Sequence, residues 1–435
     1  MRVGVYRQVP MSSGGAFQYE AGLLDALSDI TGSVSYELVC INHANESLRG
    51  ILQSGQLRYG NLPLRPLGEF RISQPPPESF LQAPHEDALP ASFTLSDEIV
   101  PDPIVGEALR DEGIDLLFSL HATTAGPDSL LPFIAPIHDL QHRIQPEFPE
   151  VSAGGIAEAR EATFRRICRY ATLVLVDSDA GRNDVLRYYG DLIDGDRIRV
   201  LPYFPPARRV PSPGPKDIAR VRSRYSLPER FFFYPAQFWK HKNHRLIVEA
   251  LALLEKTKGE QLHVVFAGTY TERERARNFL ETMALAENLG VLARVHYLGF
   301  VPDRDIPALY TLSAGLVMPT FFGPTNMPPL EAWSFGRPVI ITGLPSIRAQ
   351  LGDGALYIDP REPASLAQAM LALWHNDALA EKLVANGAQR LALYSYEDFA
   401  NVVRTILDEG VDRVRRNRNP AYPVTWAQAC TERGE

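Results

Sequence analysis

The segment at residues 321–333, FFGPTNMPPLEAW, concentrates residue types that could bind a phosphate. Its glycine and prolines predict a loop, and Pro329 suits the first turn of a helix that runs to Phe335. Backbone N–H groups at a helix start are unpaired and carry partial positive charge, so they attract phosphate. Because proline has no N–H, the donors left at this helix start belong to Thr325, Asn326, Met327 and Leu330.

Glu331 lies one turn into this predicted helix. Its carboxylate can accept two hydroxyl hydrogen bonds, which suits the diol of a ribose. Alternatively, Glu331 only complements the positive end of the dipole of a capped helix. The segment therefore indicates a nucleotide site, with an ordinary helix start as the alternative.

A second segment that could do chemistry, residues 234–244 (YPAQFWKHKNH), lies where a strand ends and a helix begins after Asn243. A fixed cation there would stabilise the charge that grows on a diphosphate leaving group, and we assign this role to Lys242. The alternative is a solvated basic turn. His241 and His244 resemble a metal pair, but no carboxylate or cysteine lies at ligand spacing, so we expect no metal.

Two further candidate sites lie in the first half of the chain. Gly14 and Gly15 follow a predicted strand, where glycine lets the backbone approach a ligand closely, although such pairs are common in strand-to-helix turns. His138, Asp139 and His142 end another strand in the sequence IHDLQH. A single histidine is more often structural than catalytic, but a His-Asp-x-x-His cluster at a strand end favours function.

These segments follow short β-rich runs that alternate with helical patterns, which predicts α/β domains with parallel sheets and crossover helices. The runs cover residues 3–9, 36–41, 115–120, 134–140, 172–177 and 197–202, and then 231–236, 262–268, 294–298, 315–319, 338–342 and 356–358. The main helical patterns cover residues 18–29, 156–170, 180–189 (after an N-cap at Ser178 and Asp179), 244–255 and 272–287. Ligands of parallel sheets bind beyond the carboxyl ends of the strands, which is where the candidate residues lie.

The alternation divides the chain into two similar halves. We place a Rossmann-like first domain at 1–203, a linker at 204–215, a second Rossmann-like domain at 216–392, and a C-terminal helix and tail at 393–435 that cross back to the first domain. The linker is proline-dense and can continue neither a helix nor a central strand. Residues 62–103 are Pro-rich and weakly periodic, which predicts an irregular insertion. Two such domains facing one another leave an interdomain cleft.

Composition narrows the class of protein. A formal charge of −8 over 435 residues argues against a nucleic-acid partner, so phosphate recognition must be local. Cys40, Cys168 and Cys430 are too far apart for a disulfide framework, which indicates free thiols in a reducing cytoplasm. No apolar stretch approaches the ~20 residues that span a bilayer. We expect a soluble cytoplasmic protein, with peripheral contact at the inner face of the cell membrane as the alternative.

One predicted helix carries a cluster of arginines that could meet anionic lipid. A solvated helix face is the simpler interpretation, and we prefer it. The four residues are Arg160, Arg165, Arg166 and Arg169.

An ordered set of segments resembles the retaining glycosyltransferases of family 4, and the similarity extends over most of the chain. The segments are IHDLQH followed by PEF, VDSDAGRNDV, RIRVLPYF, YPAQFWKHKNH, HYLGFVPDRDIPALY and GPTNMPPLEAWSFGRPVI. The resemblance implies the GT-B architecture, in which two Rossmann-like domains face a cleft. It also implies a hexosyltransferase that moves a sugar from a nucleoside-diphosphate sugar to a hydroxyl, keeps the anomeric configuration and needs no metal or other cofactor.

The resemblance also implies roles for single residues. His138 would contact the donor sugar, Lys242 the diphosphate and Glu331 the ribose, and these three form the catalytic set. The expected substrate-binding residues are Gly14, Gly15 (near the diphosphate), Asp139, Gln237, Lys240, Phe300 and Val301 (near the nucleobase), Gly323, Thr325, Asn326, Met327 and Leu330. Family habit suggests GDP-mannose as the donor and a glycan or lipid-linked glycan as the acceptor, as in the synthesis of O-antigen and other bacterial surface polysaccharides.

Two positions depart from the family pattern. Gly323 stands where the family has an acid eight residues before Glu331, so a donor-sugar contact must come from elsewhere, with Asn326 or the backbone as candidates. Gln237 stands where an arginine is common, and an amide does not replace a bidentate cation. These departures leave two alternatives open besides a transferase: a nucleotide-sugar epimerase of the same architecture, and a catalytically silent sugar-nucleotide-binding subunit. The sequence does not indicate an oligomeric state.

Overall fold

The computed structural model describes residues 1–6, 15–42, 64–66, 106, 109–204, 210–271 and 273–416. The chain forms two compact α/β units. Unit 1 comprises Met1–Pro146, Val151–Pro202 and Tyr396–Glu435, and unit 2 comprises Glu147–Glu150 and Tyr203–Ser395. The short segment at residues 147–150, which sequence patterns place in the first domain, thus groups with the second unit.

Unit 1 is built on a parallel sheet of seven strands in the order β3-β2-β1-β4-β5-β6-β7. The strands are β1 (Arg2–Tyr6), β2 (Glu37–Asn42), β3 (Leu64–Pro66), β4 (Leu116–Ser119), β5 (Phe133–Pro136), β6 (Leu173–Val176) and β7 (Ile198–Val200). Its helices are α1 (Gly15–Ile30), α4 (Ala125–Ser129), α5 (Gln141–Ile144), α7 (Ile156–Tyr170), α8 (Asp179–Tyr189) and α17 (Tyr396–Arg415). A further short helix, α6, covers Pro149–Ser152.

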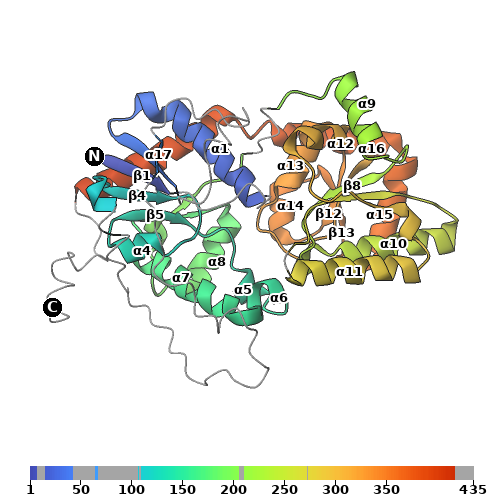
Figure 1. The fold of residues 1–435 in the computed structure, drawn as a ribbon, viewed down its shortest axis with the longest axis horizontal. Coiled ribbons are helices and arrows are strands. Elements are labelled where there is room, and N and C mark those ends of the chain that lie inside the picture. The colour runs from blue at the N-terminus through green and yellow to red at the C-terminus, as the bar shows by residue number, and fades with distance from the viewer. Residues whose placement is uncertain are drawn as a thin grey trace, which may run out of the picture. The chain divides into compact units, whose positions relative to one another are not determined.

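The last helix of the chain, α17, packs against α1 and β4 of unit 1 (Figure 1). Its polar side chains form hydrogen bonds with residues at or near strands on both sides of the sheet centre, β2 and β7. Tyr36 donates its hydroxyl to Asp408 at 3.0 Å, and Arg199 binds Glu409 through Nε at 2.7 Å. Residues after the second unit therefore complete the core of the first.

Unit 2 is built on a parallel sheet of six strands in the order β10-β9-β8-β11-β12-β13. The strands are β8 (Phe232–Pro235), β9 (Val264–Ala267), β10 (Val295–Tyr297), β11 (Gly315–Met318), β12 (Val339–Thr342) and β13 (Ala355–Ile358). The helices are α9 (Pro215–Arg224), α10 (His244–Lys258), α11 (Arg273–Asn288), α12 (Ile306–Leu312), α13 (Met327–Ser334), α14 (Pro345–Leu351), α15 (Pro363–His375) and α16 (Asp377–Leu391).

The predicted alternation is confirmed, because strands that are buried on both faces read as continuous apolar runs. Phe231, Phe232, Phe233 and Tyr234 are all fully buried at the centre of unit 2. The helix at Ile156–Tyr170 has the predicted bounds, and the Ser178 side chain caps α8 by accepting from the Gly181 N–H at 3.2 Å.

Two predictions about the first half were wrong in detail. The segment 62–103, predicted to be irregular, contains β3, which pairs in parallel with β2. This strand has three residues, which is too short for a period of two to be recognised. β5 ends at Pro136 instead of residue 140, so His138 lies in the loop beyond the strand.

Candidate functional site

The centre of the unit 2 sheet is the point where its strand order reverses. β8 and β11 are neighbours there, and the chain leaves them towards opposite edges of the sheet. Such a switch point is the usual ligand position of an open parallel sheet. The segment with Lys242 follows β8 and the segment with Thr325 follows β11, so both predicted phosphate-binding segments lie at this one point.

The two segments are tied together by backbone hydrogen bonds. The Phe321 N–H donates to the His241 carbonyl at 2.8 Å, and the Thr320 hydroxyl donates to the same carbonyl at 3.3 Å. Asn243, which has a positive φ of 58°, donates its side-chain amide to the Pro319 carbonyl at 3.1 Å. The Tyr234 hydroxyl donates to the carbonyl of Lys242 at 2.8 Å. The backbone of Lys242 is thus fixed beside the loop that leads to α13.

The start of α13 is held by Gln350 of α14. The Gln350 side chain accepts from the Asn326 N–H and donates to the Asn326 carbonyl, both at 2.9 Å. Asn326 is the N-cap of the helix, and its N–H, which the sequence predicted to be open to a phosphate, is therefore already paired.

The helix begins at Met327, which places Pro329 in its first turn as predicted. Leu330 is then the fourth helical residue, and an N–H at this position bonds within the helix, so the prediction of a free donor at Leu330 was also wrong. The backbone donors left for an anion are those of Thr325 and Met327. The Thr325 hydroxyl is buried and has no hydrogen-bond partner within the described part of the chain, which adds a polar group at this point.

Gly323 has a φ of 142°, a backbone conformation that residues with a side chain rarely adopt and that would be strained in them. A Cβ atom at this position would lie 2.6 Å from Oδ1 of Asn326. The Asn326 amide, which donates to the Gly323 carbonyl at 3.3 Å, thus occupies the space in front of residue 323. The departure from the family pattern at Gly323 is built into the backbone and is coupled to Asn326.

Glu331 lies on α13, where the hydroxyl of Tyr310 donates to its carboxylate Oε2 at 2.8 Å. Burial raises the pKa of Glu331 to about 7, although the Tyr310 hydrogen bond works in the other direction. The charge of Asp303 adds to the rise. Such a carboxyl group is close to half ionised near neutral pH and gains from any hydroxyl donor that a ligand brings.

The other predicted residues of unit 2 differ in exposure. Lys240 is exposed, and Gln237 accepts a hydrogen bond from the indole N–H of Trp239 at 2.9 Å. Phe300 is 59% exposed, whereas Val301 is buried and its side chain is not open to a nucleobase. The ring of Phe300 is well placed for stacking on a planar group.

The two histidines of the basic segment have separate surroundings. His241 binds Glu150 twice, through its N–H at 2.8 Å and through Nδ1 at 2.6 Å, and its ring lies 6.2 Å from that of Phe148. His244 is fully buried and stacks on Phe238 at 4.0 Å, and burial lowers its pKa to about 3. Among the described residues, no group of three or more His, Cys, Asp or Glu side chains lies together as metal ligands do.

In unit 1, His138 is part of a polar cluster beyond the carboxyl ends of the strands. Its Nδ1 lies 3.1 Å from Oδ1 of Asp177, and its ring lies edge-on to Tyr19 at 4.6 Å. Nearby His121 binds the buried Glu20 at 3.0 Å. Burial alone would lower the pKa of His138, but the charge and hydrogen bond of Asp177 raise it overall. The cluster can hold an imidazole in a defined orientation beside a hydroxyl-bearing ligand.

The rest of the predicted His-Asp-x-x-His cluster does not converge on His138. Asp139 accepts from the N–H of Gln141 at 2.9 Å and forms an ion pair with Arg160. His142 is buried and binds Glu161 at 3.2 Å, so it is part of the core. The prediction that His142 lies with His138 was therefore wrong. His142 is on α5, and its side chain contacts Glu161 in the core.

The arginines of α7 do not form the solvated face that we preferred. Arg160, Arg165 and Arg166 are partly buried, and Arg166 lies 4.0 Å from Asp128. Only Arg169 of the four is exposed. Gly15 is the first residue of α1, and Gly14 lies outside the described residues.

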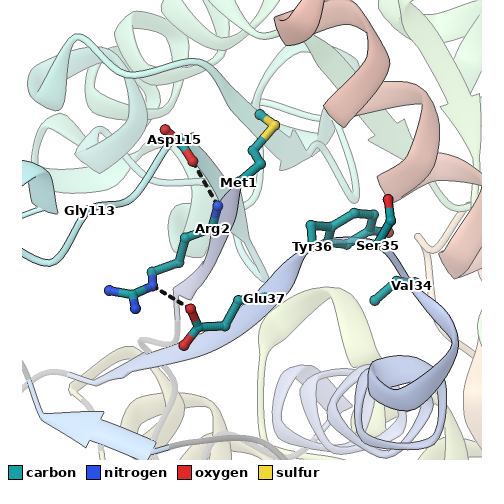
Figure 2. Close-up of a pocket in the computed structure, with 8 residues that line it drawn as sticks. All are labelled: Met1, Arg2, Val34, Ser35, Tyr36, Glu37, Gly113 and Asp115. Atoms are coloured by element: carbon teal, nitrogen blue, oxygen red, sulfur yellow. Dashed lines mark hydrogen bonds and ion pairs between the residues drawn. The ribbon is translucent and has the colours of Figure 1, made fainter.

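A hollow that the sequence did not indicate lies at the opposite edge of the unit 1 sheet, where β1, β2 and β4 begin. It has a volume of about 550 Å³ and is lined by Met1, Arg2, Val34, Ser35, Tyr36, Glu37, Gly113 and Asp115. Figure 2 shows its charged groups turned toward one another, with the Arg2 N–H bound to Asp115 at 2.7 Å and Nε bound to Glu37 at 2.9 Å. Since these groups satisfy each other at the amino ends of the strands, we give the hollow no role in the site.

The part of the chain that matches a known protein family lies within unit 2. Residues 216–390 match the family model described as glycosyl transferases group 1. The O-antigen chain mannosyltransferase B of Escherichia coli is 24% identical over 279 residues, which cover 63% of this chain and 70% of that protein. The D-rhamnosyltransferase WbpZ of Pseudomonas aeruginosa is 29% identical over 221 residues, which cover 48% of this chain and 51% of that protein.

Among solved structures, HepE of Anabaena, in complex with UDP and glucose, resembles the whole chain. The TM-score is 0.69 at 16% sequence identity, and the match covers 94% of this chain and 99% of that one. This likeness concerns the fold. No helix in the described part of the chain is both long and apolar enough to cross a membrane. The described cysteines, Cys40 and Cys168, are buried and form no disulfide, as predicted, and Cys430 lies outside the described residues.

Proposed function

We propose that the chain is a group 1 glycosyltransferase with the GT-B fold, which transfers a hexose from a nucleoside-diphosphate sugar to a hydroxyl of a glycan and keeps the anomeric configuration. The donor would bind at the switch point of unit 2. The observation that carries this proposal is the junction of the Lys242 segment with the start of α13 through the carbonyl of His241.

The site offers a suitable group for each part of a nucleoside diphosphate: the diphosphate, the ribose and the nucleobase. Lys242 and the N–H groups of Thr325 and Met327 lie on segments that leave neighbouring strands and are tied to each other, which suits a diphosphate. Glu331, one turn further into α13, suits the ribose diol. The exposed ring of Phe300 beyond β10 suits the nucleobase.

Transfer then needs no side-chain nucleophile. The bond between the anomeric carbon and the diphosphate oxygen breaks, and the acceptor oxygen forms its bond to the same face of that carbon. The leaving phosphate oxygen takes the acceptor proton. Lys242 and the start of α13 stabilise the negative charge that grows on the diphosphate, and a preorganised charge of this kind lowers the barrier most in a site that excludes water.

We propose GDP-mannose as the donor and a growing surface polysaccharide, free or lipid-linked, as the acceptor. The named relatives support this choice, since one is an O-antigen mannosyltransferase and another a rhamnosyltransferase. HepE, which was solved with UDP and glucose, keeps UDP-glucose as the second donor to test. We place the enzyme in the cytoplasm, with contact to the inner face of the membrane when the acceptor is lipid-linked.

We also propose that neither a metal nor another cofactor takes part. Lys242 and the α13 start supply the positive charge that a metal would otherwise give to the diphosphate. Activity that survives prolonged treatment with a chelator would support this proposal, and activity restored only by an added divalent cation would contradict it.

The test of the proposed function is transfer of labelled mannose from GDP-mannose to a mannose-terminated oligosaccharide. The product should carry an α-linked mannose, and GDP should be released in equal amount. Interconversion of the donor sugar without acceptor would favour the epimerase alternative. Nucleotide binding without transfer to any acceptor of a broad panel would favour a silent binding subunit.

A further inference from the structure

Tyr310 on α12 is fully buried, yet its hydroxyl reaches the proposed nucleotide site. The hydroxyl donates to Oε2 of Glu331 at 2.8 Å and also lies 3.4 Å from the Pro328 carbonyl. The ring packs edge-on against Phe233 at 5.1 Å and is stacked on Phe335 at 5.8 Å. Packing on two sides leaves the hydroxyl little freedom, so it is a fixed donor.

The carboxyl group of Glu331 depends on this donor. Within the described part of the chain, the Tyr310 hydroxyl is the group that hydrogen-bonds it. Glu331 is half-buried, and a carboxylate with one donor there is poorly compensated for the water it has lost. Its remaining oxygen lone pairs can accept from the hydroxyls of a ligand. The orientation of those lone pairs is set by the bond that Tyr310 makes to Oε2.

We infer that Tyr310 is a positioning residue of the donor site, whose hydroxyl holds the Glu331 carboxylate turned so that it accepts both hydroxyls of a ribose. The inference rests on the proposed function and assigns a new residue to it. Tyr310 itself does not touch the ligand, because its side chain is fully buried.

Two physical effects make the hydroxyl important for binding. It supplies a hydrogen bond to a charged group, a class of bond that is stronger than one between neutral groups. It also favours the ionised form of Glu331, whose pKa burial has raised to about 7 with a contribution from Asp303. Below that pH the carboxyl group is protonated, so it loses its charge and one of its oxygens becomes a donor. It then accepts less well from the two ribose hydroxyls, and nucleotide affinity should rise as the pH rises through this range.

The test compares GDP and UDP with their 2′-deoxy counterparts, by calorimetry on the full chain at pH 6 to 9. The wild type should bind the better ribonucleotide about tenfold more tightly than its 2′-deoxy form at pH 8, which is the loss of about one hydrogen bond to a charged group. Tyr310→Phe should lose most of this discrimination at pH 7, with the deoxy affinity nearly unchanged. The midpoint of its pH dependence should move to a higher pH.

Tyr225→Phe is the matched control, because the Tyr225 hydroxyl donates to the buried carboxylate of Asp305 at 2.9 Å in the same unit. It removes the same kind of bond and should leave ribose discrimination and the pH midpoint as in the wild type. Tyr310 would have a merely structural role if the Tyr310→Phe variant kept the ribose discrimination and the pH midpoint of the wild type. The same would follow if the variant bound the ribo and the deoxy nucleotide more weakly by the same factor. If the wild type binds ribo and deoxy forms equally, this inference alone fails, whereas absence of any nucleotide binding overturns the proposed function as well.

Discussion

The backbone N–H of Phe321 donates a 2.8 Å hydrogen bond to the carbonyl of His241. The two residues follow different strands and are far apart in the chain, so the bond joins two loops at the switch point of the sheet. One loop carries Lys242 and the other leads to α13. A displacement of either loop is therefore transmitted to the other, and both halves of the proposed diphosphate site share one rigid support.

Replacing Lys242 by alanine should lower turnover by at least about a hundredfold, because the loss of a preorganised charge on the leaving group typically costs ~2.7–4 kcal/mol. The fold should persist, since alanine keeps the backbone carbonyl to which the Tyr234 hydroxyl donates. Initial rates with GDP-mannose and the thermal midpoint measure the two effects. Lys256→Ala, an exposed lysine at the end of α10, is the control, and equal rates for the two variants would remove Lys242 from the mechanism.

Glu331→Gln should make the nucleotide-free protein more stable above pH 7. The folded-state pKa of Glu331, about 7, lies above its ordinary value of 4.5, so the stability that the group contributes is present below pH 4.5 and is lost as the pH rises through 7. The glutamine has no such dependence, and the gain at pH 8 should be on the order of 2 kcal/mol.

Urea unfolding of Glu331→Gln at pH 5 and pH 8 measures this gain. The same variant should bind GDP more weakly, which would show that the glutamate trades stability for function. An identical pH dependence of unfolding for wild type and variant would exclude a raised pKa at this position.

Gln350→Leu should loosen the start of α13, because it removes both hydrogen bonds to the backbone of Asn326. We expect a rise in the donor KM of about tenfold with a smaller change in kcat, since the Thr325 and Met327 donors lose their fixed direction. Gln350→Glu keeps the acceptor for the Asn326 N–H and should fall between leucine and the wild type. A KM unaffected by either change would show that the α13 start is held by other contacts.

Gly323→Glu should not restore the acidic contact of the family pattern. The φ of 142° and the 2.6 Å approach of Asn326 to a Cβ atom oppose any side chain, and the variant should lose about 1–3 kcal/mol of stability. Gly336→Ala is the matched control, because its φ is 67° but no atom lies within 4 Å of the added Cβ. Denaturant titration of both separates backbone strain from the clash, and a fully active, stable Gly323→Glu would contradict the coupling to Asn326.

The fold could be predicted from sequence because each strand is a short apolar run and each crossover helix has its own period. The same runs locate Lys242 and Glu331, which lie in the segments that follow β8 and β11. The exact ends of the helices and strands, and the partners of their terminal N–H groups, were harder to predict. α13 begins at Met327, and two of the four predicted N–H donors are already paired: that of Asn326 to Gln350 and that of Leu330 within the helix.

The supporting residues could not be predicted, because their partners are distant in the chain. Gln350 reaches Asn326 from another helix, Tyr310 reaches Glu331 from α12, and Glu150 reaches His241 from a segment in the first half. None of these pairs leaves a local pattern of period or composition. Only tertiary packing decides which buried polar side chain meets which backbone group.

The most direct test of the donor site is a crystal structure of the chain with GDP bound. We expect a β-phosphate within hydrogen-bond distance of the Lys242 ammonium and of the Thr325 and Met327 N–H groups, with both ribose hydroxyls bound to Glu331. A diphosphate bound at any other edge of the unit 2 sheet, or a ribose turned away from Glu331, would contradict it.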